Sequence, residues 1–155
     1  GIAVADSLLS EKPVVETKNR NGIKDAIISQ KETSFDGPMV TLVNKGTASA
    51  SEILAGCLQD NERSILMGEQ TYGKGLIQSL KSLREDSGIA VTVASYLTPK
   101  GNNIQGQGIT PDKLLEIPDA SEYGGPDDKW VKNAEIFLGS LLEKEEDSVQ
   151  TIEYN

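Results

Sequence analysis

The segment from Met39 to Asp60 constrains the fold more than any other part of the chain. Residues 39–43 form an almost unbroken apolar run, typical of a buried strand, and the run ends at a polar turn at residues 44–46. Apolar residues then recur at helical spacing, at Ala50, Ile53, Leu54, Cys57 and Leu58. A strand, a tight turn and an amphipathic helix in this order indicate an α/β fold.

Further patterns place other elements around this unit. They predict a helix at residues 2–9, a hairpin at 14–28 with its turn at 19–22, strands at 64–67, 76–80 and 89–94, and a helix starting near Trp130. The 155 residues suffice for one domain. We expect a mixed sheet with flanking helices in a core at residues 1–113. Residues 114–155 are expected to form a linker, a C-terminal helix packed on the same domain and an acidic tail.

Composition argues against several classes of ligand. The chain has 15 Lys and Arg against 24 Asp and Glu, and the formal net charge of −9 disfavours nucleic acids and anionic membrane surfaces. No apolar run approaches the ~18 residues that a membrane span needs. The acidic residues show no calcium-loop spacing, so we expect no metal. Cys57, the single cysteine, is predicted to be a core residue, and Tyr72, Tyr96 and Trp130 are expected to serve packing.

The complete absence of histidine narrows the possible chemistry. Hydrolysis by a Ser-His-Asp or Cys-His arrangement is excluded, and so are zinc sites built on two histidines one helical turn apart. Nucleophilic catalysis would then need a hydroxyl that is activated by a carboxylate, a lysine or an N-terminal amine.

Ser49 is the first candidate for such a nucleophile, because it lies between the predicted strand and the first turn of the helix. The free N–H groups and positive dipole end of a helix N-terminus favour negative charge, so an oxyanion beside Ser49 could accept from the Ala50 N–H. However, Ser49 and Glu52 also have the spacing of a capping box, which is a far commoner role. Ser51 and Thr47 are further hydroxyls nearby, and spacing alone does not choose among them.

Lys74 is the second candidate, because two glycines flank it and leave the backbone free to turn sharply. A lysine acts as a general base only where burial lowers its pKa enough to release the proton near neutral pH. Gln78 lies four residues later, on the same side of an extended segment, and its amide could orient the amine. Taken alone, Lys74 and Gln78 are more typical of surface positions.

The same lysine also belongs to a partial nucleotide-binding pattern. Residues 68–74 match the phosphate-binding sequence G-x-x-x-x-G-K, but Gly75 stands where a Ser or Thr should bind magnesium. The segment after it resembles a strand more than the helix that would cradle phosphate. Nucleotide binding is therefore a remote alternative.

Several ordered blocks together resemble a known enzyme family. Residues 43–56, 58–61 and 68–79, followed by 88–94 and 108–112, are similar to the carboxyl-terminal processing peptidases, also called tail-specific proteases. The resemblance is close over about residues 39–113 and looser over 1–38. It implies a serine endopeptidase with a core like those of crotonase and the Clp protease, which cuts near the C-terminus of protein substrates without a metal or cofactor.

The resemblance also implies roles for individual residues. The family's nucleophile, lysine base and supporting glutamine correspond to Ser49, Lys74 and Gln78, and the 25-residue separation of serine and lysine selects Ser49 over Ser51. The N–H of Ala50 would serve the oxyanion. Ser51, Glu52 and Asp60 match positions that are expected to shape the site without reacting.

Two family features are expected to lie upstream of residue 1, namely a peptide-binding PDZ domain and a glycine segment that supplies a second oxyanion donor. We therefore expect the chain to be a catalytic fragment with little activity alone, because losing one such donor costs a factor of ~10² to 10³. By analogy with photosynthetic members, which mature a photosystem II reaction-centre subunit, the compartment would be the thylakoid lumen, or else the bacterial cell envelope. A non-catalytic peptide-binding relative of the same fold is the main alternative.

Overall fold

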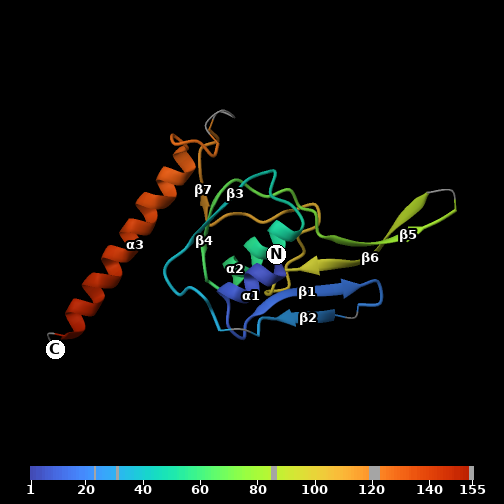
Figure 1. Cartoon of the computed structure of the whole chain (residues 1–155), viewed down its shortest axis with the longest axis horizontal. Helices are drawn as coiled ribbons and strands as arrows, with labels where there is room; N and C mark the ends of the chain where they lie inside the picture. The colour runs from blue at the N-terminus through green and yellow to red at the C-terminus, as the bar shows by residue number, and fades with distance from the viewer. Residues whose placement is uncertain (23, 31, 85–86, 119–122, 154–155) are drawn as a thin grey trace.

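Two separate sheets pack on opposite sides of helix α2 (Ala50–Asp60) in the computed structural model of the chain (Figure 1). The structure describes all residues except 23, 31, 85–86, 119–122 and 154–155. The expected α/β class is confirmed, but the strands divide between an antiparallel and a parallel sheet where one mixed sheet was expected.

The antiparallel sheet has four strands in the order β2-β1-β6-β5. Its members are β1 (Pro13–Asn19), β2 (Lys24–Ile28), β5 (Leu76–Ser82) and β6 (Gly88–Leu97). Two hairpins build it, and β1 joins them by pairing with β6, where Thr17 lies opposite Tyr96. The predicted turn between β1 and β2 forms, with the Gly22 N–H donating to the Asn19 carbonyl oxygen at 3.0 Å.

The parallel sheet has three strands in the order β3-β4-β7, formed by β3 (Val40–Val43), β4 (Ile65–Gly68) and β7 (Lys113–Leu114). Parallel neighbours need a long crossover, and α2 supplies it between β3 and β4. The strands joined by tight turns can pair only antiparallel, which is why they form the other sheet. Sequence patterns did not indicate β7, because two residues carry no periodicity.

Helix α2 is buried on two faces, each against a different cluster. Ile53, Cys57 and Leu58 pack with residues of β1 and of helix α1 (Ile2–Leu8), while Ala55 packs with Val43 and Leu66 of the parallel sheet. Burial of each large aliphatic side chain contributes about 1.5–3 kcal/mol. The packing therefore fixes α2, and with it the start of the helix at Ser49.

Cys57 is a core residue, as predicted, with 1% of its surface exposed. Burial raises the pKa of its thiol to about 12, and the negative charge of Asp60 adds to the increase. A thiol in this environment stays protonated and unreactive at neutral pH.

Among the described residues, helix α3 (Lys129–Glu153) contacts the rest of the chain through its first three turns, where Phe137 lies under the Lys113 ammonium at 4.5 Å. Trp130 and Ala134 are buried, and the Trp130 indole donates to the Glu116 carbonyl oxygen at 2.7 Å. Asp128 caps the helix by accepting from the Trp130 N–H at 2.8 Å. Further along, Ile136 is 73% exposed, and Figure 1 shows the helix extending away from both sheets. Among the described residues, no helix combines the length and apolar character required to cross a bilayer.

Candidate active site

Ser49 occupies the sharp turn that leads into α2. Its backbone has φ 55° and ψ −118°, a combination that an L-residue rarely adopts. Strain of this kind costs about 1–3 kcal/mol and persists only where the surrounding structure enforces it. Because buried residues of α2 and β3 hold the turn on both sides, Ser49 is kept in this conformation.

Ser49 is the N-cap residue of α2. Ser49 and Glu52 have the arrangement of a capping box, and the Glu52 carboxylate accepts from the Ser49 N–H at 2.9 Å. The Glu52 N–H points back to Ser49 and donates to its carbonyl oxygen at 2.9 Å, which completes the capping-box arrangement.

Ala50 begins the helix and is exposed. Within the described part of the chain its N–H has no hydrogen-bond acceptor. A free helix N-terminal N–H beside a hydroxyl is the donor that an oxyanion requires. The position equivalent to a Cβ on Gly1 lies 2.6 Å from the Ala50 carbonyl oxygen, so the start of α1 closely approaches this helix end.

Glu52 connects Ser49 to the segment that carries Lys74. It is fully buried, and its carboxylate accepts four hydrogen bonds: Oε2 from the N–H groups of Ser49 (2.9 Å) and Lys74 (2.8 Å), and Oε1 from the Gly73 N–H (2.7 Å) and the Thr71 hydroxyl (2.5 Å). Both oxygens of the carboxylate thereby have hydrogen-bond donors. Because two N–H groups reach one oxygen, the backbone nitrogens of Ser49 and Lys74 lie less than about 6 Å apart.

The segment with Lys74 is also held from its other side. Thr71 Oγ1 accepts from the Ile109 N–H at 2.7 Å, and the Tyr72 N–H donates to the Thr47 carbonyl oxygen at 2.9 Å. Gly73 has φ +88°, and a Cβ there would lie 2.8 Å from the Gly108 nitrogen. Only glycine fits this approach without displacing the neighbouring loop.

Lys74 and Gln78 line one cavity of about 730 Å³, and both residues are exposed. The other lining residues are Lys45, Gly46, Ala48, Tyr72, Gly73, Leu76 and Gln105. The turn that precedes Ser49 therefore forms one wall, although Ser49 itself is not in the lining. The backbones of Ser49 and Lys74 lie close together, because both N–H groups donate to the same Glu52 oxygen. Within the described residues, however, no hydrogen bond joins Ser49 Oγ to Lys74 Nζ. Such contacts often tighten only when substrate binds.

Of the three residues expected to shape the site, Glu52 lies at its centre and Asp60 lies far from it. Glu52 is central, as described above, and Ser51 is exposed in the first turn of α2. Asp60 ends the helix, about 15 Å along its axis from Ala50, and accepts from the Lys100 N–H at 2.8 Å. Asp60 therefore anchors the loop after β6 and does not touch the candidate site.

Sequence patterns missed three residues of this region. Thr71 is buried beneath the site, and Gln105 lines the cavity while its amide oxygen accepts from the Gly75 N–H at 2.9 Å. Tyr72 was expected to pack, but it is 67% exposed at the cavity. The bond between Gly75 and Gln105 joins residues 30 positions apart, so no local sequence pattern indicates it. A local pattern also does not show whether an isolated aromatic such as Tyr72 is buried or exposed.

The structure is incompatible with the phosphate-binding alternative. The N–H groups of Gly73 and Lys74, which would cradle a phosphate, already donate to Glu52. Strand β5 follows them, so the loop does not lead into a helix whose N-terminus would cradle phosphate.

The chain is similar to known peptidases. Peptidase family S41 matches residues 1–115. The chain is 53% identical over 118 residues to a carboxyl-terminal-processing protease of Synechocystis sp., covering 76% of the chain and 28% of that protein. It is 46% identical over 143 residues to carboxyl-terminal-processing peptidase 2, chloroplastic, of Arabidopsis thaliana, covering 91% and 26%.

The solved structure of a photosystem II D1 C-terminal processing protease superimposes with a TM-score of 0.68 at 42% identity, covering 78% of the chain and 32% of that protein. The chain spans about a quarter of the length of the two curated relatives, at 28% and 26%. The resemblance seen in the sequence motifs is confirmed, and the chain belongs to peptidase family S41.

Proposed function

We propose that this chain forms the catalytic part of a serine endopeptidase that cleaves near the C-terminus of protein substrates. The single observation that carries the proposal is the Glu52 carboxylate, which holds the Ser49 and Lys74 backbones on one oxygen beside a cavity. Residues 1–113 act as the core, and 114–155 as a linker and a helix docked through Trp130.

In the proposed mechanism substrate bound in the cavity covers the exposed Lys74 and removes its water, and Lys74 Nζ then takes the hydroxyl proton as Ser49 Oγ attacks the scissile carbonyl carbon. The Ala50 N–H stabilises the oxyanion of the tetrahedral intermediate. Lys74 then returns the proton to the departing amine, which leaves an acyl ester on Ser49. Water hydrolyses the ester, again with Lys74 taking and returning the proton, and the acid product leaves. Gln78, on the same cavity wall, orients the lysine.

The names of the relatives support a proposed substrate class and compartment. A protein tail such as that of the photosystem II D1 precursor is the proposed substrate class, since the superimposed structure is a protease of that kind. Chloroplastic and cyanobacterial relatives support action in an extracytoplasmic compartment, the thylakoid lumen or the bacterial envelope.

The test is covalent labelling of Ser49 by a fluorophosphonate, followed by mass spectrometry of the modified peptide. We expect Ser49→Ala to abolish labelling and Lys74→Ala to slow it at least tenfold, while Ser10→Ala, at an exposed serine away from the site, labels like the unmodified chain. Tail-peptide binding without any Ser49 adduct would instead favour the non-catalytic peptide-binding alternative. Unchanged labelling in Lys74→Ala would remove the lysine mechanism.

A further inference from the structure

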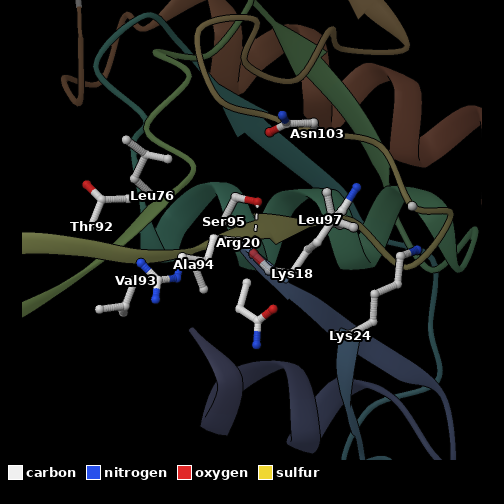
Figure 2. Close-up of a pocket in the computed structure, with 12 residues that line it drawn as sticks. Lys18, Arg20, Lys24, Leu76, Thr92, Val93, Ala94, Ser95, Leu97 and Asn103 are labelled. Carbon is white, nitrogen blue, oxygen red and sulfur yellow. Dashed lines mark hydrogen bonds between the residues drawn. The ribbon is translucent and has the colours of Figure 1, made fainter. Parts of the chain in front are cut away.

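A second cavity, of about 500 Å³, lies where the end of β1 meets β6 and the loop that follows β6 (Figure 2). Lys18, Arg20 and Lys24 come from the β1–β2 hairpin, and Figure 2 shows their side chains around the opening with Ser95 and Asn103. Leu76 and Leu97 supply apolar surface. The cavity therefore combines cations, hydrogen-bonding groups and an apolar surface.

The charge of this cavity is opposite to that of the chain. The formal net charge is −9, yet three of the described lining residues are basic and none of them is acidic. Lys24 pairs with Glu16 at 2.9 Å, while within the described part of the chain neither Lys18 nor Arg20 has an ion pair. A local cationic surface in an acidic protein attracts anionic groups that the rest of the surface repels.

This cationic cavity adjoins the candidate active-site cavity. Leu76 lines both cavities. In addition, Gln78 of the active-site cavity pairs across the β5–β6 ladder with Thr92 of the cationic cavity. Directly paired residues share one face of a sheet, so the two cavities meet along the same pair of strands. An extended peptide in the active-site cavity can continue over Leu76 into the cationic cavity.

We propose that the cationic cavity binds a carboxylate of the peptide substrate, with Lys18 and Arg20 as its ligands. The proposal rests on the peptidase function, because it places the scissile bond of the same peptide at Ser49. Guanidinium and ammonium groups form charge-assisted hydrogen bonds with carboxylates, and a peptide carries such groups at its C-terminus and on acidic side chains. The cavity thus selects tails that bear a negative charge.

The experiment measures fluorescence anisotropy with the whole chain carrying Ser49→Ala, so that binding is read without turnover. Three dye-labelled, alanine-rich peptides are compared: one with a free C-terminal carboxylate, the same peptide amidated, and the amidated peptide with one internal glutamate. The variant pair Lys18→Gln/Arg20→Gln is matched by Lys12→Gln/Lys81→Gln, which changes net charge equally at exposed lysines outside both cavities.

We expect at least one carboxylate-bearing peptide to bind about tenfold tighter than the neutral amide, with the preference lost in Lys18→Gln/Arg20→Gln and kept in the matched control. The free acid and the glutamate peptide distinguish an α-carboxylate from a side-chain carboxylate. The proposal is overturned if all three peptides bind with equal affinity or if neither carboxylate peptide binds. It is also overturned if the control pair loses the preference for carboxylate as fully as Lys18→Gln/Arg20→Gln does. Failure of the peptidase function is seen separately, as absent fluorophosphonate labelling of Ser49.

Discussion

Glu52 and Lys74, 22 residues apart in the sequence, are joined by a 2.8 Å hydrogen bond from the Lys74 N–H to the buried Glu52 carboxylate. The same oxygen accepts from the Ser49 N–H, so one side chain sets the spacing of the proposed nucleophile and base. Helix α2 is fixed by its packing in the core, and Glu52 is fixed with it. The core packing therefore also determines the position of the candidate site.

Replacing Glu52 by glutamine tests this arrangement. An amide has one acceptor oxygen and introduces two donors among four groups that already donate, so buried N–H groups lose their partner. We expect the free energy of unfolding to fall by about 2–3 kcal/mol in chemical denaturation. Glu62→Gln, at an exposed position just after α2, serves as the control, and an equal effect in both variants would contradict the role of Glu52.

The strained backbone of Ser49 predicts a gain in stability from glycine. Ser49→Gly and Ser49→Ala both remove the hydroxyl and abolish labelling, but only glycine relieves the strain at φ 55° and ψ −118°. We expect Ser49→Gly to exceed Ser49→Ala in free energy of unfolding by about 1 kcal/mol, measured by urea titration. If the alanine variant were equally stable, the conformation would carry no strain.

The buried thiol of Cys57 predicts a pH-dependent stability. Its pKa is 9.0 in the unfolded chain and about 12 in the folded one, so the unfolded state releases its proton first as pH rises. The contribution is therefore complete below pH 9 and declines between pH 9 and pH 12. We expect a steeper loss of stability over this window in the unmodified chain than in Cys57→Val. Parallel curves for the two proteins would contradict the shift.

The same residue predicts slow thiol chemistry. Because Cys57 is 1% exposed, a thiol reagent such as dithionitrobenzoate should react at pH 8 only after denaturant is added. Stoichiometric reaction within minutes in native buffer would show that the helix opens readily.

The docking of helix α3 is tested at Trp130. Trp130→Phe removes the hydrogen bond to Glu116 and should lower the free energy of unfolding by about 1 kcal/mol, whereas Trp130→Ala should cost about 3–5 kcal/mol. Ile136→Ala, at a side chain that is 73% exposed, should change it by less than about 0.5 kcal/mol. Similar effects at Trp130 and Ile136 would contradict docking through the first turns alone.

Local sequence patterns determined much of the element order. The apolar run before Asn44 and the helical spacing from Ala50 correspond closely to β3 and α2, and the Asn-Gly turn produced the β1–β2 hairpin. These signals were readable because periodicity of 2 or 3.6 depends only on neighbouring residues. The family motifs likewise indicated Ser49, Lys74 and Gln78, although the roles of these residues stay predictions.

Tertiary structure alone decided how these elements combine. Nothing in the sequence pattern showed that the strands form two sheets, that Glu52 receives donors from residues 71–74, or that Tyr72 faces a cavity. The cationic cavity likewise depends on the register between β1, β5 and β6. Such features arise from contacts between residues far apart in the chain, whose energies depend on the packed geometry and leave no local period.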